Sequence, residues 1–356
     1  MKPVAAGLTL AALTLPCAYA AQPTATAATS QAATQTTTEA AAAAPAPTYG
    51  AQLEGFDYPH PIQRFKLTSQ QQALEMAYMD IAPKGKANGR TAVLLHGKNF
   101  CGATWQETIR VLSEQGWRVI APDQIGFCAS SKPKGYQFSF GQLAANTHAL
   151  LQSLNIKQAT VIGHSMGGML ATRFALNHPQ AVSQLVMVNP IGLEDWQAAG
   201  VPYATIDQLY QGELKTSFEG IKAYQLRFYY NGLWKPEYDR WVHMQAGLYA
   251  GPGRESVAWN QAQTSDMVFT QPVVHEFAQL KVPTLLVIGG KDRTAPGAAR
   301  APKAIADKLG DYPALGRATA KAIPGAQLVE FPALGHSPQV ESPKEFHEAL
   351  LRGLKG

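Results

Sequence analysis

Short apolar segments alternate with longer helical patterns along most of this chain. The short segments are rich in branched aliphatic residues, which predicts strands at residues 62–67, 73–81, 91–95, 118–122, 159–162, 184–188, 284–288 and 327–331. Between most of the later strands, and after the last one, the spacing predicts helices at residues 105–115, 140–154, 166–177 and 344–354. Strands and helices alternating at this spacing favour right-handed crossovers. We therefore predict an α/β protein with a mostly parallel central sheet and helices on both faces.

The interval from residue 191 to about 280 interrupts this alternation. It has no clear strand pattern, yet it contains many Trp, Tyr and Phe residues. A structureless loop of that length inside a compact domain is improbable. We predict a mainly helical cap at 191–280, inserted into a core formed by 49–190 and 281–356. Most of its aromatic residues are expected to pack the cap, and a few to face a ligand pocket.

The first twenty residues have the pattern of a secretory signal. Lys2 is their only charged residue, an apolar run follows, and Ala18-Tyr19-Ala20 supplies small residues around a cleavage point. Residues 21–48 are nearly all Ala, Thr, Gln and Pro, which predicts a disordered linker. The protein is thus expected in the periplasm or outside the cell, without stable membrane insertion after cleavage. An uncleaved anchor and lipidation at Cys17 remain the alternatives.

Residues 163–167 read Gly-His-Ser-Met-Gly and lie between a predicted strand and a predicted helix. A Gly-x-Ser-x-Gly motif at such a junction places its serine, here Ser165, on a sharp turn that aims the hydroxyl into a cleft. The same turn puts the backbone N–H of Met166 at a helix N-terminus, where it can stabilise a developing oxyanion. We predict Ser165 as a nucleophile and Met166 as an oxyanion donor.

With this motif, the chain resembles the α/β-hydrolase family from about residue 62 to its end. Residues 94–97 (Leu-Leu-His-Gly) are similar to the family's oxyanion loop, and residues 123–127 (Asp-Gln-Ile-Gly-Phe) to the segment after its next strand. The resemblance implies the α/β-hydrolase fold. It also implies that the second oxyanion donor is a backbone N–H after Gly97, that of Lys98 or its neighbour Asn99. The side chain of Lys98 is expected to face solvent.

A serine hydroxyl needs a base to take its proton. His336 follows the last predicted strand, which resembles the position of the family's catalytic histidine, whereas His96 and His164 lie inside the motif loops and are expected to be structural. The acid should follow a strand between the serine and the histidine. Asp292 meets this requirement directly after strand 284–288, and Asp195, after the preceding strand, is its rival.

Removal of the signal leaves two cysteines, Cys101 and Cys128. Cys128 departs from the family at a place where glycine is common, and Cys101 lies in the predicted oxyanion loop. Neighbouring strands can carry these loops close together, and exported proteins are oxidised. We therefore hypothesise a Cys101–Cys128 disulfide that braces the oxyanion loop, with two buried thiols as the alternative.

The implied reaction is two-step acyl transfer without a cofactor or metal, because the histidines lack a short paired spacing such as His-x-x-x-His. The formal charge is +5, but the basic residues are scattered, so a nucleic-acid partner is not expected. The expected partner is a small-molecule acyl substrate, and the oligomeric state stays open. A carboxylesterase ranks first and a carbon-carbon bond hydrolase second. Peptidase, lactonase and perhydrolase chemistry use the same constellation. The long cap resembles that of carboxylesterases, carbon-carbon bond hydrolases and cofactor-free haloperoxidases. A non-catalytic binding protein is the least favoured interpretation.

Overall fold

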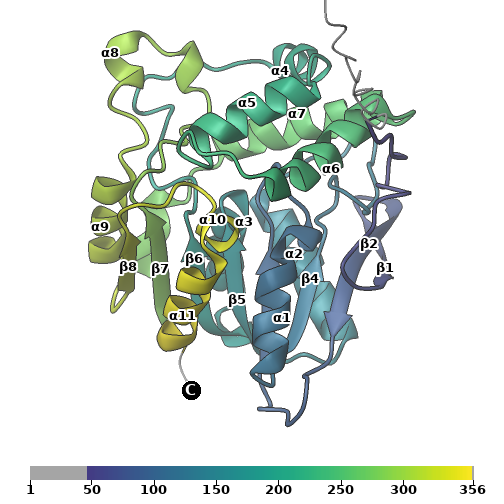
Figure 1. Ribbon diagram of the computed structural model, residues 1–356, viewed down its shortest axis with the longest axis vertical. Helices are drawn as coiled ribbons and strands as arrows, with labels where there is room; N and C mark the ends of the chain where they lie inside the picture. The colour runs from purple at the N-terminus through teal and green to yellow at the C-terminus, as the bar shows by residue number, and fades with distance from the viewer. Residues whose placement is uncertain (1–45, 355–356) are drawn as a thin grey trace, which may run out of the picture. The chain divides into compact units, whose positions relative to one another are not determined.

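The structure of the chain is a computed structural model that describes residues 46–354, so the predicted signal and nearly all of the predicted linker lie outside the described residues. Eight strands form one sheet in the order β1-β2-β4-β3-β5-β6-β7-β8 (Figure 1). Their bounds are β1 (Ile62–Ser69), β2 (Gln72–Ile81), β3 (Thr91–Leu95), β4 (Arg118–Pro122), β5 (Ala159–His164), β6 (Val182–Val188), β7 (Thr284–Gly289) and β8 (Gln327–Phe331). Strands β3 to β8 are parallel, and β2 runs antiparallel to both of its neighbours.

Helices cover both faces of this sheet. On one face, α1 (Gln106–Glu114) and α11 (Pro343–Gly353) pack together. On the other face lie α2 (Phe140–Ser153), α3 (Met166–Asn177) and α9 (Tyr312–Ala322). Strand β5 is buried at every residue, because its alternate side chains enter the two opposite helical layers. The predicted fold class is confirmed.

Three helices near the carboxyl end of the chain were not predicted. These are α8 (Lys303–Ala306), α9 and α10 (Pro338–Glu341). Two of them are single turns, too short for an apolar period to show. Helix α9 is rich in small residues and has only three buried residues, so its sequence carries a weak pattern.

Between β6 and β7 the chain forms α4 (Ile206–Glu213), α5 (Phe218–Phe228), α6 (Asp239–Ala250) and α7 (Arg254–Thr270). In Figure 1 these helices lie above the ends of the strands. Two of these helices have N-cap residues that the sequence supplies locally. The Thr205 and Ser217 side chains accept hydrogen bonds from backbone N–H groups in the first turns of α4 and α5. Most cap aromatics pack internally, as in the stacked pair Tyr230 and Tyr238, whose ring centroids are 3.8 Å apart.

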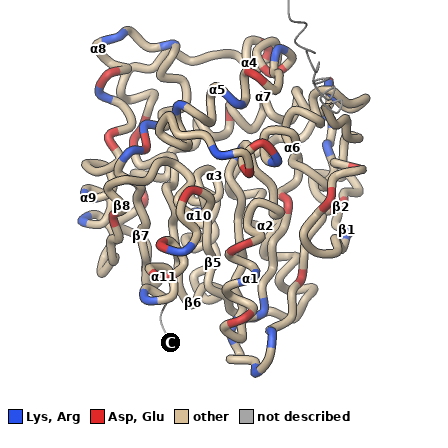
Figure 2. Tube along the Cα trace, viewed as in Figure 1, with Lys and Arg blue, Asp and Glu red and all other residues tan. Residues whose placement is uncertain are grey.

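The described part of the chain contains no helix long and apolar enough to cross a membrane. Its charges are mixed: Figure 2 shows Lys and Arg interspersed with Asp and Glu over the trace, in keeping with the scatter of basic residues in the sequence.

Candidate active site

Ser165 stands at a sharp turn between β5 and α3. Its φ is 56° and its ψ is −121°, a strained combination for a residue with a side chain. The flanking glycines are required by close packing. A Cβ on Gly163 would lie 2.0 Å from the carbonyl oxygen of Gly167, and a Cβ on Gly167 would lie 2.1 Å from that of Leu95. The motif therefore has the strand-turn-helix geometry that its sequence predicts.

His336 and Asp292 form a fully buried pair. The Nδ1–H of His336 donates to Oδ2 of Asp292 across 2.6 Å, and neither side chain is exposed. In the neutral imidazole, this bond places the proton on Nδ1 and leaves Nε2 to accept a proton from a serine. Nε2 is buried and has no hydrogen-bond partner among the described residues. The rival Asp195 instead pairs with His275 at 2.8 Å in a more exposed place, so the structure sets Asp292 against His336.

Asn189 is a site residue that the sequence reasoning missed. Its Nδ2 donates to Oδ2 of Asp292 across 2.9 Å, and its Oδ1 accepts from the N–H of Gly289. The other oxygen of Asp292 accepts from the N–H of Thr294 at 2.8 Å. With hydrogen-bond donors to both oxygens, the buried carboxyl group is held in one orientation. A polar residue directly after the apolar strand β6 was the signal available.

The two motif histidines are structural. The Nδ1–H of His96 donates to the carbonyl oxygen of Gly97 at 2.8 Å, and its Nε2 accepts from the N–H of Gln124. The Nε2–H of His164 donates to the carbonyl oxygen of His336 at 2.8 Å, which ties the nucleophile turn to the histidine loop. Burial lowers the pKa of both rings, that of His164 well below its usual range, so both remain neutral.

The loop after β3 passes directly beside the nucleophile. A Cβ on Gly97 would lie 3.1 Å from the Cβ of Ser165, so the next residue, Lys98, enters the same space. Both Lys98 and Ser165 line one cavity of about 280 Å³ beneath the cap. The N–H of Met166 lies at the start of α3, where the helix dipole favours negative charge. Both predicted oxyanion donors therefore border the serine.

The expectation that the Lys98 side chain faces solvent was wrong. Its Nζ donates to Oε1 of Glu213 in α4 at 3.0 Å and to Oε1 of Gln261 in α7 at 3.1 Å. Only 18% of each partner in the Lys98–Glu213 ion pair is exposed. The hydroxyl of Tyr249 donates to the second oxygen of Glu213. Two cap helices fold over the oxyanion loop and enclose this lysine, a contact that no local pattern encodes.

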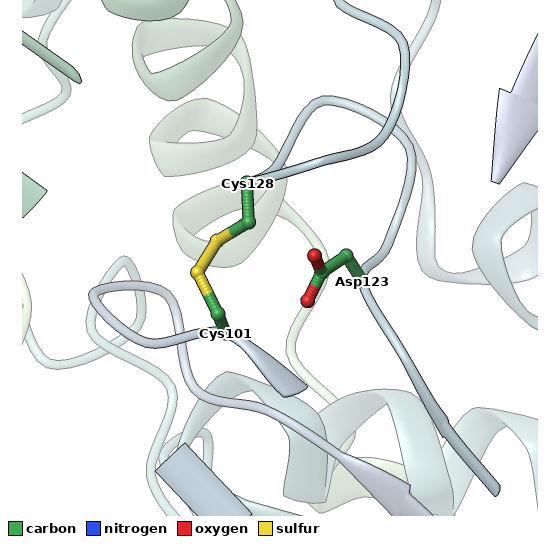
Figure 3. Close-up of side chains that lie close together, drawn as sticks. All are labelled: Cys101, Asp123 and Cys128. Atoms are coloured by element: carbon green, nitrogen blue, oxygen red, sulfur yellow. A yellow bond between two sulfur atoms is a disulfide. The ribbon is translucent and has the colours of Figure 1, made fainter. Parts of the chain in front are cut away.

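Cys101 and Cys128 are joined by a disulfide in the structure, with Cα atoms 6.0 Å apart (Figure 3). Cys128 has a φ of 44°, a left-handed conformation that explains why glycine is common at its position in the family. The bond links the loops after β3 and β4. Formation of this bond in the protein stays a prediction.

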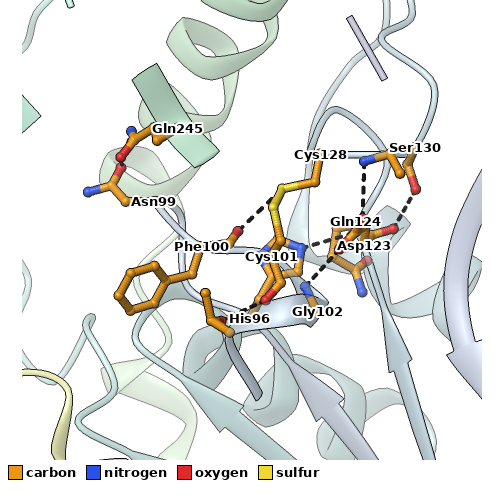
Figure 4. The surroundings of a disulfide bond; sticks show 12 residues. His96, Asn99, Phe100, Cys101, Gly102, Asp123, Gln124, Cys128, Ser130 and Gln245 are labelled. Carbon is orange, nitrogen blue, oxygen red and sulfur yellow. Dashed lines mark hydrogen bonds between the residues drawn. A yellow bond between two sulfur atoms is a disulfide. The ribbon is translucent and has the colours of Figure 1, made fainter. Parts of the chain in front are cut away.

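Asp123 lies beside the two cysteines and binds both loops. Its Oδ1 accepts from the N–H of Gly102 at 2.7 Å (Figure 4). Its Oδ2 accepts from the N–H of Ala129 and from the hydroxyl of Tyr58. The carboxylate and the two sulfurs lie close enough to hold a metal ion. Both carboxylate oxygens already accept hydrogen bonds, however, and a disulfide sulfur is not a thiolate ligand. The arrangement fits a structural brace better than a metal centre.

Removing the brace should destabilise the fold. We expect the double substitution Cys101→Ala and Cys128→Ala to lower the free energy of unfolding by about 3–4 kcal/mol, because the bond closes a loop of 27 residues. Urea unfolding of both proteins without reductant measures the difference. Thiol titration of the denatured, unreduced protein without residues 1–20 is the companion test: two free thiols would exclude the bond.

Glu341, the last residue of α10, contacts the backbone of the loop that carries His336. Its Oε2 accepts from the N–H of Gly335 at 2.6 Å. Burial raises the pKa of this carboxyl to about 7.

This raised pKa predicts a pH-dependent stability. Because the folded chain holds the Glu341 proton more tightly than the unfolded chain, stability should fall as pH rises from about 4.5 to about 7. We expect Glu341→Gln, which keeps an acceptor oxygen, to make this fall in the free energy of unfolding smaller by roughly 3 kcal/mol, since one pKa unit corresponds to about 1.4 kcal/mol. Urea unfolding at pH 5 and pH 8 measures it, with the exposed Glu348→Gln as the control. Equal declines in wild type and Glu341→Gln would contradict the assignment.

Three features together define the hydrolase class. They are a mostly parallel sheet with a cap over its carboxyl edge, a serine on a strained turn, and a buried histidine-aspartate pair. The family described as alpha/beta hydrolase fold matches residues 92–343, and the chain belongs to this family. The predicted fold and resemblance are confirmed.

Particular relatives agree with this class. The chain is similar to the crystal structure of a probable hydrolytic enzyme from Pseudomonas aeruginosa PAO1, with 61% identity, a TM-score of 0.86, and coverage of 87% of this chain and 99% of that one. It is 27% identical over 273 residues to Lipase 1 of Psychrobacter immobilis, covering 74% of this chain and 76% of the lipase. It is also 27% identical over 242 residues to a putative non-heme chloroperoxidase of Synechocystis sp., covering 64% and 84%.

Proposed function

We propose that this α/β hydrolase is a carboxylesterase that cleaves small to medium esters through an acyl-enzyme on Ser165. The observation that carries the proposal is the buried His336–Asp292 pair. In the neutral imidazole it leaves Nε2 to accept a proton, in a buried site that also contains a serine on a strained turn. A neutral imidazole in this tautomer is the base that a serine nucleophile requires.

In the proposed mechanism, Oγ of Ser165 attacks the ester carbonyl carbon while its proton passes to Nε2 of His336. Asp292 stabilises the imidazolium that forms. The negative charge on the former carbonyl oxygen is met by the N–H groups of Met166 and Lys98. The bond to the leaving oxygen then breaks, and His336 gives its proton to the alcohol. Water repeats the sequence on the acyl-enzyme and releases the acid.

The cavity supports a small or medium acyl group. Its volume is about 280 Å³, near the lower end of ligand pockets. Apolar and aromatic side chains form much of its wall, including Ile191, Leu209, Tyr224, Val268 and Phe269. One further polar contact is available from the buried hydroxyl of Thr294, which has no partner within residues 46–354.

A panel of p-nitrophenyl esters with acyl chains of two to twelve carbons tests the proposal. We expect the highest kcat/KM for short and medium chains and a steep fall for the longest ones. The same protein should cleave a vinylogous 1,5-diketone, the carbon-carbon bond substrate class, far more slowly. No turnover of any ester, or faster cleavage of the diketone, would contradict the carboxylesterase assignment.

We also propose that the enzyme is exported. The signal pattern of residues 1–20 and the two cysteines in the loops after β3 and β4 support this location. N-terminal sequencing of the protein from the periplasm or medium should begin at Ala21. Protein found only in the cytoplasm with Met1 intact would contradict export.

A further inference from the structure

Tyr229 is a cap residue that borders the proposed reaction centre without a role in the mechanism above. It follows α5 and lines the same cavity as Ser165. Its side chain is buried, and its ring centroid lies 4.6 Å from that of His336 and 5.5 Å from that of Phe100. The ring therefore lies between the histidine and the oxyanion loop.

The hydroxyl of Tyr229 is held from the oxyanion loop. Nδ2 of Asn99 donates to it across 2.9 Å. Oδ1 of Asn99 accepts in turn from Nε2 of Gln245 in α6, which sets the orientation of the amide (Figure 4). The tyrosine oxygen is thus used as an acceptor, while its proton has no acceptor among the described side chains and backbone groups.

The backbone of Tyr229 is fixed independently of this hydroxyl. Its carbonyl oxygen accepts from the N–H of His336 at 3.1 Å, and a Cβ on Gly335 would lie 2.4 Å from that oxygen. Burial raises the pKa of the phenol well above its usual range, so the group keeps its proton through neutral pH. A buried O–H donor on a residue that lines the nucleophile's cavity, with a fixed backbone and no acceptor among the described residues, is suited to a substrate atom.

We propose that the hydroxyl of Tyr229 donates a hydrogen bond to the substrate carbonyl oxygen as it becomes an oxyanion, as a third donor beside the N–H groups of Met166 and Lys98. This inference rests on the proposed esterase function. The carbonyl oxygen is the recipient because Asn99, which holds the hydroxyl, directly follows Lys98 in the oxyanion loop. The leaving oxygen receives its proton from His336.

Tyr229→Phe tests the proposal with little disturbance, since it keeps the ring and the backbone bond to His336. We expect kcat for esters to fall about 10²-fold, the loss typical of one oxyanion donor, with KM nearly unchanged. The decisive readout is the matching thionoester, whose carbonyl sulfur accepts hydrogen bonds weakly. Tyr229→Phe should slow the thionoester much less than the ester. Asn99→Ala, which releases the hydroxyl, should show the same selectivity with a smaller loss.

Tyr230→Phe is the matched control, because this neighbouring buried tyrosine lies outside the cavity wall. It should keep kcat within about twofold, on the scale of a change without oxyanion contact. Three results for Tyr229→Phe would overturn the inference while the wild type remains an esterase. They are unchanged ester turnover, an equal loss with the thionoester, and a loss that grows with the pKa of the leaving alcohol. A wild type without esterase activity would overturn the proposed function itself.

Discussion

Replacing Ser165 with alanine should lower kcat for an ester by about 10⁶-fold, the loss seen when a serine nucleophile is removed from an intact constellation. The oxyanion donors and the His336–Asp292 pair would remain, but no acyl-enzyme could form. Alanine keeps the Cβ, so the turn with φ of 56° carries the same strain. We therefore expect the melting temperature to stay close to that of the wild type. Steady-state kinetics with p-nitrophenyl esters measures the loss.

Ser183→Ala provides the matched control. Ser183 lies near the start of β6, and its hydroxyl contacts Thr160 at the opposite end of the strands from the cavity. Its activity should equal that of the wild type. Ester turnover by Ser165→Ala within tenfold of the wild type would mean that another residue attacks the substrate, and the proposed mechanism would have to be abandoned.

Asp292→Asn should lower kcat by about 10⁴-fold, although it preserves the size of the side chain. An amide at this position offers an N–H to His336, and the imidazole would then carry its proton on Nε2, where it cannot accept one from Ser165. The buried environment prevents water from rescuing the correct tautomer, because both side chains are fully enclosed. The pH dependence of kcat/KM measures the effect, and the loss should not be recovered by raising the pH, because the two neutral tautomers of an imidazole carry the same number of protons.

Asp195→Asn is the control for this prediction. Asp195 follows the preceding strand and contacts His275 rather than His336. Its substitution should leave kcat unchanged. A large loss in Asp195→Asn together with an active Asp292→Asn would reverse the assignment of the acid.

Much of the fold could be predicted because the sheet is covered on both faces. A strand such as β5, buried at every residue, appears in the sequence as a continuous apolar run, so its position is visible without knowledge of its neighbours. The prediction of Ser165 rested on its motif between a strand and a helix, that of His336 on a position that resembles the family's histidine, and that of Asp292 on its place directly after a strand. Parallel strands end at one edge, and residues directly after them meet there.

The unpredicted features depend on contacts between distant segments. Lys98 was expected in solvent because its enclosure requires α4 and α7 to fold over the loop. Asn189 supports Asp292 from a separate strand, and its role is invisible until the two strands are paired. Tyr229 stood among many cap aromatics, and only the contacts of its hydroxyl with Asn99 and of its carbonyl with His336 distinguish it. In each case the local residue pattern is ordinary and the partner is far away in sequence.

The central claim is that Ser165 is a nucleophile activated by His336. Reaction of the protein with a fluorophosphonate probe, followed by mass spectrometry of the peptides, tests it most directly. The account predicts one label per chain, attached to Ser165, lost in Ser165→Ala and strongly slowed in Asp292→Asn. A wild-type protein that takes up no label, or carries it on another residue, would contradict the account.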